Sequence, residues 1–186
     1  MVTNSTPLVF CHFGNPRYLK YTLRCAKRTN PSRKLVLLGD QSNRKTALCE
    51  GCEHYPFERF KSPLHSDFER VYRQVQGLDH NPMRGKRDWL KFVFERWYHV
   101  EGFAREFDAD RFWHFDSDTM ILGDLSEYEE TLQDFDFTLQ CNNTCLNGLV
   151  KRDVLSDFNK HTVSLFENDD FLSSQQHEFD TIHPNY

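Results

Sequence analysis

Short apolar runs alternate with a helical pattern near the start of the chain. Leu8 to Phe13 form an apolar run that ends at Gly14-Asn15-Pro16, which predicts a buried strand followed by a turn. Apolar positions then recur at near-helical spacing over residues 17–29, which predicts a helix. Lys34 to Leu38 predict a second strand. This order of strand, helix and strand indicates a βαβ unit and a parallel sheet.

The middle of the chain is dominated by one long amphipathic helix. Residues 42–50 predict a short helix, and His54 to Phe57 a short strand before a loop. Ser66 to Val75 are again helical in pattern, and Gly77 to Gly85 are rich in turn residues. Apolar residues from Arg87 to Phe107 fall near i, i+3, i+4 and i+7, so this helix is expected to turn its aromatic stripe toward the core.

The part of the chain from Asp110 onward predicts a further strand followed by mixed elements. Asp110 to Phe115 predict a strand, residues 126–132 a short helix, Phe135 to Gln140 a strand, and Leu149 to Phe166 a helix. The last twenty residues are polar and lack clear periodicity. Because no repeat or linker interrupts the pattern, residues 1–186 are expected to form one α/β domain with a mostly parallel central sheet flanked by helices.

Composition and charge narrow the class of protein. The formal net charge is −5, which argues against a broad basic face for nucleic acid. Aromatic residues make up 15% of the chain, enough to build a core. No apolar run approaches the roughly 20 residues of a membrane span, so no integral membrane segment is expected. The N-terminus has no basic start and no long apolar stretch, so we expect no signal peptide and a soluble, cytoplasmic protein.

Two cysteine pairs leave two interpretations open. Cys49 and Cys52 form a C-x-x-C, and Cys141 and Cys145 form a C-x-x-x-C. Together they could hold zinc. The pairs also fit plain buried thiols, which we favour for a chain without a secretory signal.

The segment FWHFDSDTMIL carries the strongest chemical signal. Asp116 and Asp118 stand at i and i+2 where a strand gives way to a loop, and such residues face the same way in an extended segment. Ligand sites of parallel α/β sheets lie at the carboxyl ends of strands. Two carboxylates on one side can hold Mg²⁺ or Mn²⁺, which in turn neutralises a diphosphate. The alternative is a pair of solvated turn residues, because Asp and Ser are common in turns.

Four segments together resemble the nucleotide-sugar-dependent glycosyltransferases of the GT-A fold. The chain opens with LVFCHFGN, which is followed by a helix and the strand KLVLLGD. The helix KRDWLKFVFERW has a basic residue near its start and precedes HFDSDTMIL, which is close to the family's hydrophobic-D-x-D-hydrophobic pattern. Beyond it, FDFTLQCNNTCLNGLVKRDVL resembles the family's strand, Asn-Gly turn and helix. The resemblance implies a single Rossmann-like GT-A domain.

The resemblance also implies a role for each matching residue. Asp118 would ligate Mn²⁺ or Mg²⁺, and Asp116 would ligate the same metal or bind the ribose, with Ser117 between them in the donor site. The partners would be a nucleotide-sugar donor and an unknown glycan, protein or small-molecule acceptor. His12, Phe13 and Gly14, at the end of the first strand, would border the nucleotide. Arg87 would lie near the diphosphate or the sugar. Asn147 and Gly148 would line the site of the donor sugar or of the acceptor. Gly14, Arg87 and the Asn-Gly turn also fit ordinary turn and surface positions.

The chain departs from the family pattern in its C-terminal part, after FDFTLQCNNTCLNGLVKRDVL. Family members are usually longer, so the acceptor-side C-terminal part is expected to be short or incomplete. GT-A enzymes often supply a third metal ligand, for which His177 and His183 are candidates outside any motif. Glu167, Asp169 and Asp170 form an acidic cluster at a plausible place for a general base, but charge runs are usually solvated faces, and neither retention nor inversion follows.

Two alternatives remain beside the glycosyltransferase. A haloacid-dehalogenase-like phosphatase would use Asp116 as nucleophile, but its D-x-D-x-[TV] pattern has Thr or Val where Met120 stands here, and its motif belongs near the start of the domain. The other alternative is a degenerate domain that binds sugar nucleotides, or a protein partner, without turnover.

Overall fold

A five-stranded sheet forms the centre of the protein. The computed structural model describes residues 6–77, 87–139 and 147–183, apart from the side chains of residues 87 and 88. The strands run in the order β3-β2-β1-β4-β5. β1 pairs in parallel with β2 and β4, β2 pairs in parallel with β3, and only β5 is antiparallel to its neighbour β4. The strands are β1 (Leu8–His12), β2 (Leu35–Gly39), β3 (Glu53–Pro56), β4 (Arg111–His114) and β5 (Gly148–Lys151).

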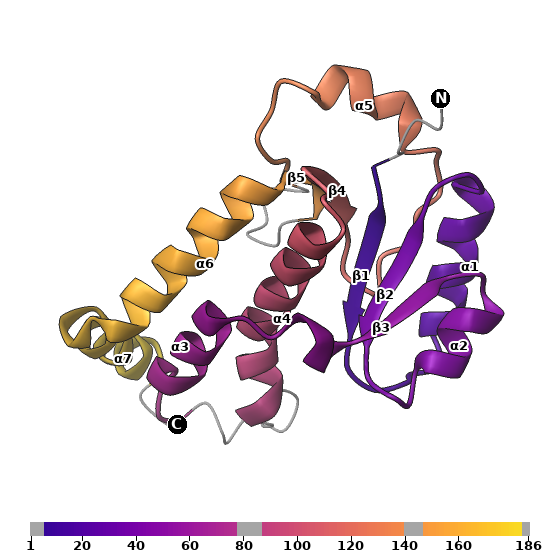
Figure 1. The fold of residues 1–186 in the computed structure, drawn as a ribbon. Coiled ribbons are helices and arrows are strands. Elements are labelled where there is room, and N and C mark those ends of the chain that lie inside the picture. The colour runs from indigo at the N-terminus through magenta and orange to yellow at the C-terminus, as the bar shows by residue number, and fades with distance from the viewer. Residues whose placement is uncertain (1–5, 78–86, 140–146, 184–186) are drawn as a thin grey trace.

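Helices cover both faces of this sheet. Figure 1 shows α1 and α2 on one side and α4, with α3 and α6 beyond it, on the other. The helices are α1 (Leu19–Thr29), α2 (Arg44–Cys49), the 3₁₀ helix η1 (Phe57–Phe60), α3 (Pro63–Val71), α4 (Arg87–Glu106), α5 (Ser126–Leu132), α6 (Arg152–Glu167) and α7 (Asp169–Ile182). The expected α/β architecture, a mostly parallel sheet flanked by helices in a Rossmann-like arrangement, is therefore confirmed.

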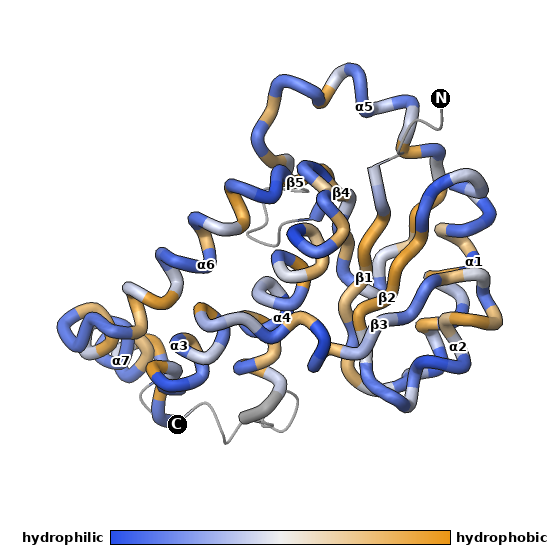
Figure 2. Tube along the Cα trace, in the orientation of Figure 1, coloured by the Kyte–Doolittle hydropathy of each residue, from blue (hydrophilic) through white to orange (hydrophobic). Residues whose placement is uncertain are grey.

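The core consists of two apolar layers separated by the sheet. Alternate residues of β1 point into opposite layers, so Leu8 and Phe10 pack with α1 while Val9 and Cys11 pack with α4. All five residues of β2 are buried, as expected of a parallel strand covered on both faces. The apolar colouring of β1 and β2 in Figure 2 marks this central position.

The strands and helices of the N-terminal half form close to where the pattern predicts them. β1, α1, β2, α2 and β3 each lie within about two residues of the expected bounds, and the parallel pairing of β1 with β2 confirms the βαβ interpretation. α3 begins earlier than expected, at Pro63 rather than Ser66. Ser62 caps this helix by accepting a hydrogen bond from the His65 amide at 3.1 Å, and Pro63 suits the first helical turn.

Two predictions for the C-terminal half are wrong. The expected strand from Phe135 to Gln140 is only a single antiparallel bridge between Phe137 and Val150, with Gln140 outside the described residues. The helix expected from Leu149 begins at Arg152, because residues 148–151 form β5. The last twenty residues, for which the sequence pattern predicts no element, contain α7, whose N-terminus is capped by Asn168. Among the described helices, none is long and apolar enough to cross a membrane.

Candidate functional site

The order of the strands creates a switch point between β1 and β4. From β1 the chain winds outward through β2 and β3 on one side, while β4 pairs with the opposite edge of β1. The loops after β1 and β4 therefore leave the sheet side by side, and the segment after β4 continues along α1, where the Ile121 carbonyl accepts a hydrogen bond from Thr29. In open α/β sheets, ligands bind outside the carboxyl ends of the strands at such a point. The FDSD segment follows β4 directly, and Phe13 and Gly14 follow β1, which ends at His12.

A cleft of about 700 Å³ opens at this switch point. Its walls come from the ends of β1 and β4, from Tyr18 at the start of α1 and from α4. The lining residues are Cys11, His12, Phe13, Tyr18, Trp89, Lys91, Phe92, Val93, Glu95, Arg96, Asp116, Ser117 and Asp118. This volume suits a small-molecule ligand.

The two motif aspartates lie in different surroundings. Asp116 accepts an ion pair from Arg96, whose Nη1 lies 2.5 Å from its Oδ1, and its backbone amide donates to Asn147 Oδ1 at 2.9 Å. Asp118 is exposed and forms no ion pair with any other residue that the structure describes. One carboxylate is thus neutralised by a protein cation, while the other faces the cleft with its oxygens open to a ligand.

Ser117, between the aspartates, joins the two loops. Its Oγ lies 2.7 Å from His12 Nδ1, a hydrogen bond between the ends of β4 and β1. Burial lowers the pKa of His12, although the nearby carboxylates of Asp40 and Asp118 oppose this shift. His12 is therefore a neutral imidazole at neutral pH, able to donate or accept one hydrogen bond at each ring nitrogen.

Asp40 and Asn43, which follow β2, hold the loop after β1 in place through hydrogen bonds. Asn43 is fully buried, and its Nδ2 donates to the carbonyl oxygens of His12 at 2.8 Å and Gly14 at 2.9 Å. The Gly14 amide donates to the Asp40 carboxylate. Gly14 adopts a φ of +86°, which a residue with a side chain rarely takes up. Partial burial would raise the pKa of Asp40, but hydrogen bonds from Ser42 and Gly14 outweigh it and hold the pKa below its usual range.

Aromatic side chains stand at the mouth of the cleft. The Phe13 side chain is 68% exposed and the Trp89 side chain is 50% exposed. The Phe13 ring lies 6.2 Å from the Phe92 ring, and Tyr18 meets the His12 ring edge-on at 5.9 Å. Such exposed rings beside polar groups can stack against a planar ligand.

Charged and thiol groups complete the lining. Burial would raise the pKa of Glu95, but hydrogen bonds from His65 and Lys91 outweigh it and lower the pKa to about 2. Burial raises the pKa of the Cys11 thiol well above its usual range, so Cys11 is a neutral thiol and not a thiolate nucleophile.

The structure brings together most of the residues that the sequence points to. Five of them line the cleft: His12, Phe13, Asp116, Ser117 and Asp118. Gly14 and Asn147 do not line the cleft, but they form hydrogen bonds with the loops that do: Gly14 with Asp40 and Asn43, and Asn147 with the Asp116 amide. Gly148 begins β5 with a φ of +130°, and a side chain there would overlap Thr138. This glycine is therefore explained by backbone geometry. The Arg87 side chain lies outside the described residues.

Sequence reasoning missed the contribution of α4. Trp89, Phe92, Val93 and Arg96 stand at i, i+3, i+4 and i+7, so one face of the helix lines the cleft. The expectation that the aromatic stripe belongs wholly to the core is wrong for Trp89, which is half exposed. The signal in the sequence was Arg96, a basic residue at a position where the stripe should be apolar.

The C-terminal candidates lie away from this arrangement. Glu167 and Asp169 form ion pairs with Arg70 and Arg73, and Asp170 belongs to the first turn of α7, where acidic residues favour a helix. His177 is part of α7 and His183 follows its end. Within the described part of the chain, none of these residues lines the cleft.

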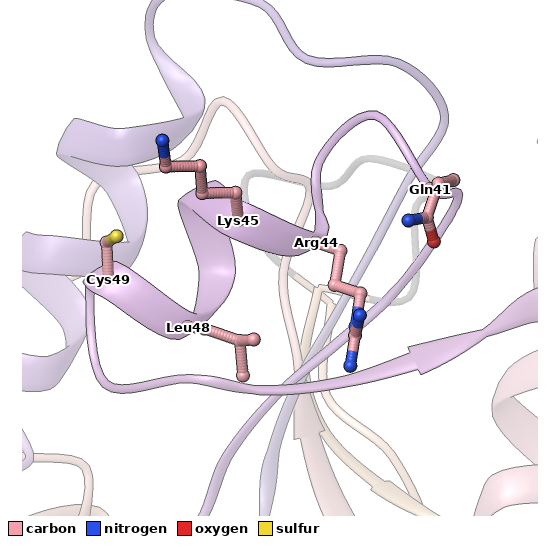
Figure 3. Close-up of a pocket in the computed structure, with 5 residues that line it drawn as sticks. All are labelled: Gln41, Arg44, Lys45, Leu48 and Cys49. Carbon is pink, nitrogen blue, oxygen red and sulfur yellow. The ribbon is translucent and has the colours of Figure 1, made fainter.

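The C-x-x-C segment separates its two thiols. Cys52 is buried in the core beside α1, whereas Cys49 is exposed at the end of α2. Cys49 borders a second, smaller hollow of about 360 Å³, shown in Figure 3 with Gln41, Arg44, Lys45 and Leu48. Cys141 and Cys145 lie outside the described residues.

Comparisons with known proteins add no family. No protein-family model matches the chain, and no curated protein matches it. The functional argument therefore depends on the geometry of the cleft.

Proposed function

We propose that the protein is a metal-dependent glycosyltransferase of the GT-A type, which transfers a sugar from a nucleoside-diphosphate sugar to an acceptor. The observation that carries the proposal is the position of Asp116 and Asp118 on the loop after β4, at the switch point of a Rossmann-like sheet and on the wall of a cleft. A diphosphate is the kind of ligand that needs a cation at such a point.

The acidic motif fits a hard divalent cation. Asp118 offers open carboxylate oxygens toward the cleft, and Asp116 lies two residues before it. Oxygen donors are the ligands that Mg²⁺ and Mn²⁺ prefer. Asp118 would be the principal ligand, because Arg96 already pairs with Asp116. When bound, the cation would supply electrostatic stabilisation of the leaving diphosphate.

The remaining cleft residues suit the rest of a nucleotide-sugar donor. Phe13 and Trp89 offer exposed rings against which a base can stack. Arg96 and Lys91, which pair with Asp116 and Glu95, also bring N–H groups to the lining of the cleft, where they would bind phosphate oxygens. His12, neutral and held by Ser117, would hydrogen-bond the ribose. These residues bind and orient the donor, and positioning is a large part of catalysis in group transfer.

The phosphatase alternative is less well supported. In that mechanism, the Asp116 carboxylate would attack phosphorus. Arg96 Nη1 lies 2.5 Å from Asp116 Oδ1, which engages one of the oxygens that would act as nucleophile. A degenerate binding domain would keep the same cleft and differs from the enzyme only in turnover.

Turnover of donor in Mn²⁺ separates the three possibilities. Release of nucleoside diphosphate from UDP- and GDP-sugars is followed for the wild type, for Asp118→Asn, and for Asp134→Asn as a matched control on an exposed aspartate away from the cleft. The proposal expects slow hydrolysis that Asp118→Asn abolishes and Asp134→Asn keeps. Cleavage of an aryl phosphate that requires Asp116 would instead establish the phosphatase. Binding of nucleotide without hydrolysis would establish the degenerate domain.

A further inference from the structure

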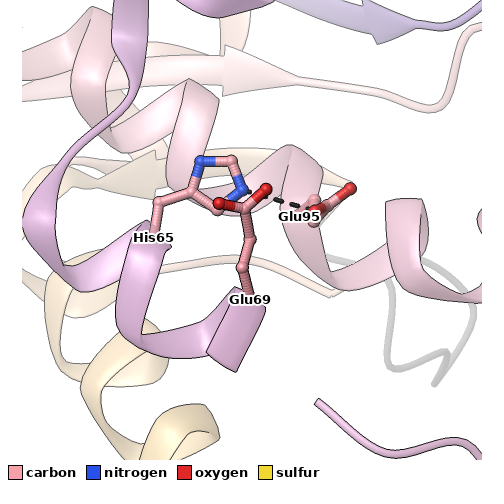
Figure 4. Close-up of side chains that lie close together, drawn as sticks. All are labelled: His65, Glu69 and Glu95. Carbon is pink, nitrogen blue, oxygen red and sulfur yellow. Dashed lines mark hydrogen bonds and ion pairs between the residues drawn. The ribbon is translucent and has the colours of Figure 1, made fainter. Parts of the chain in front are cut away.

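His65, Glu69 and Glu95 gather on the side of α4 next to the cleft. His65 and Glu69 stand one helical turn apart on α3, and Glu95 reaches them from α4, as Figure 4 shows. One ligand atom from each lies within 4.8 Å of the others. Glu95 also lines the cleft, so the group is continuous with the site described above.

The imidazole of His65 is not satisfied by the fold alone. The side chain is only 2% exposed, and its Nδ1 has no hydrogen-bond partner among the described residues. Its Nε2 points at Glu95, but the distance to Oε1 is 3.5 Å, which is long for a hydrogen bond. A metal ion bound to Nε2 would replace this long contact by a direct bond. Nδ1 is the other ring nitrogen and takes no part in the site.

The 3.5 Å between His65 Nε2 and Glu95 Oε1 is long for a hydrogen bond, but it matches the distance between two ligand atoms of one zinc ion. Zn–N and Zn–O bonds of about 2.0–2.1 Å place two ligand atoms of a tetrahedral site about 3.4 Å apart. One imidazole and two carboxylates favour Zn²⁺ over Mg²⁺ and Ca²⁺, which prefer oxygen ligands alone. Three protein ligands would leave the fourth position to water or to a ligand in the cleft.

Two lysines hold the carboxylates in the absence of an ion. Lys91 Nζ lies 2.8 Å from Glu95 and 3.7 Å from Glu69, and Lys61 Nζ lies 3.2 Å from Glu69. Both lysine side chains are partly exposed, so each can swing into solvent. The ammonium of Lys91 and a divalent cation would compete for the same oxygens.

We propose that His65, Glu69 and Glu95 form a zinc site that joins α3 to α4 on the wall of the cleft, with Lys91 as its internal competitor. The site is separate from the Asp116–Asp118 motif and does not depend on the glycosyltransferase proposal. Zinc binding would also release Lys91 toward the cleft, which it lines.

Zinc titration of the full, chelator-treated chain tests the site. Asp118→Asn serves as the parent, so that zinc at the motif does not contribute. In this background, Glu95→Gln and Glu69→Gln are each expected to weaken Zn²⁺ binding by at least about 100-fold, since even outer partners of a metal are worth 10–100-fold. Glu106→Gln is the matched control on α4, because Glu106 pairs with Arg59 outside the cluster. It should leave the affinity unchanged, whereas Lys91→Gln should tighten binding several-fold.

X-ray absorption at the zinc edge separates this site from the cysteines. The proposal expects only nitrogen and oxygen ligands at about 2.0–2.1 Å, whereas thiolates would add sulfur at about 2.3 Å. A sulfur shell, or equal Zn²⁺ affinity in Glu95→Gln, Glu69→Gln and the parent, would overturn the proposal. Circular dichroism checks that each variant is folded. If Glu95→Gln does not fold, the Zn²⁺ affinity of Glu69→Gln decides, because Glu69 is more exposed than Glu95. Binding of nucleoside diphosphates in Mn²⁺ is measured separately on the wild type, and it tests the Asp116–Asp118 site and not the zinc site.

Discussion

Arg96 Nη1 lies 2.5 Å from Asp116 Oδ1 and joins α4 to the loop after β4. Both side chains are largely buried, and the Arg96 guanidinium also covers the Trp97 ring at 4.7 Å. The pair fixes the acidic motif against the wall of the cleft and makes its two carboxylates inequivalent. Asp116 is part of the protein framework, whereas Asp118 is open to a ligand.

The Arg96–Asp116 pair should contribute to stability as a unit. Arg96→Met and Asp116→Ala are each expected to destabilise the fold, with a coupling free energy of about 1–2 kcal/mol, between the values for exposed and buried ion pairs. Urea unfolding of both single variants and the double variant measures this coupling. Purely additive effects would show that the two side chains do not interact in solution.

Stability should fall as the pH drops below neutrality because of His99. Burial and the neighbouring His65 lower the pKa of His99 from 6.5 to about 4, so the unfolded chain takes up a proton that the folded one does not. Between pH 6.5 and 4 the unfolded state is therefore favoured increasingly, by on the order of 3 kcal/mol at about 1.4 kcal/mol per pKa unit. His99→Phe, which keeps a ring against Phe57, should flatten this slope in urea unfolding at several pH values. An unchanged slope would contradict the assignment to His99.

The buried Asn43 should be essential to the loop after β1. Asn43→Ala removes two hydrogen bonds to the His12 and Gly14 carbonyls and should cost about 2–3 kcal/mol of unfolding free energy. Asn15→Ala is the matched control, because Asn15 is exposed and accepts one bond from Thr46 at 3.1 Å. Its effect should stay within about 0.5 kcal/mol. Equal effects of the two changes in chemical denaturation would refute this role.

Gly148 should tolerate no side chain. Gly148→Ala combines a φ of +130° with an overlap on Thr138 Oγ1, which accepts a hydrogen bond from the Leu149 amide at 2.9 Å. We expect a loss of about 2–3 kcal/mol, measured by thermal unfolding. Gly123→Ala is the control, since a Cβ there meets nothing within 4 Å and should change little. A mild effect at Gly148 would mean that β5 can shift away from Thr138.

The central strands could be predicted because both of their faces are buried. β1 and β2 read as unbroken apolar runs between turn residues, and that signal does not depend on distant contacts. β5 was missed because Gly148–Lys151 runs into α6 without a turn residue, so its short apolar run merges with the helical pattern. α7 was missed because none of its residues is buried, which leaves no periodic apolar stripe.

The candidate site was only partly predictable. Asp116 and Asp118 follow an apolar strand, and the carboxyl end of a parallel strand is a place where ligands bind. Arg96 and Trp89 could not be assigned to the cleft, because the sequence shows the period of α4 but not which part of its stripe the neighbouring loops leave uncovered. That depends on the packing of η1 and β1 against the helix.

The most direct test of the central claim is binding of nucleoside diphosphates with and without Mn²⁺. Melting temperature is measured for the wild type, Asp118→Asn and Asp134→Asn with UDP, GDP and their sugars, because a ligand stabilises the state that binds it. We predict a rise that one nucleotide produces only with Mn²⁺, that Asp118→Asn abolishes and that Asp134→Asn retains. No rise with any nucleotide, or an equal rise in Asp118→Asn, would contradict a donor site at the switch point between β1 and β4.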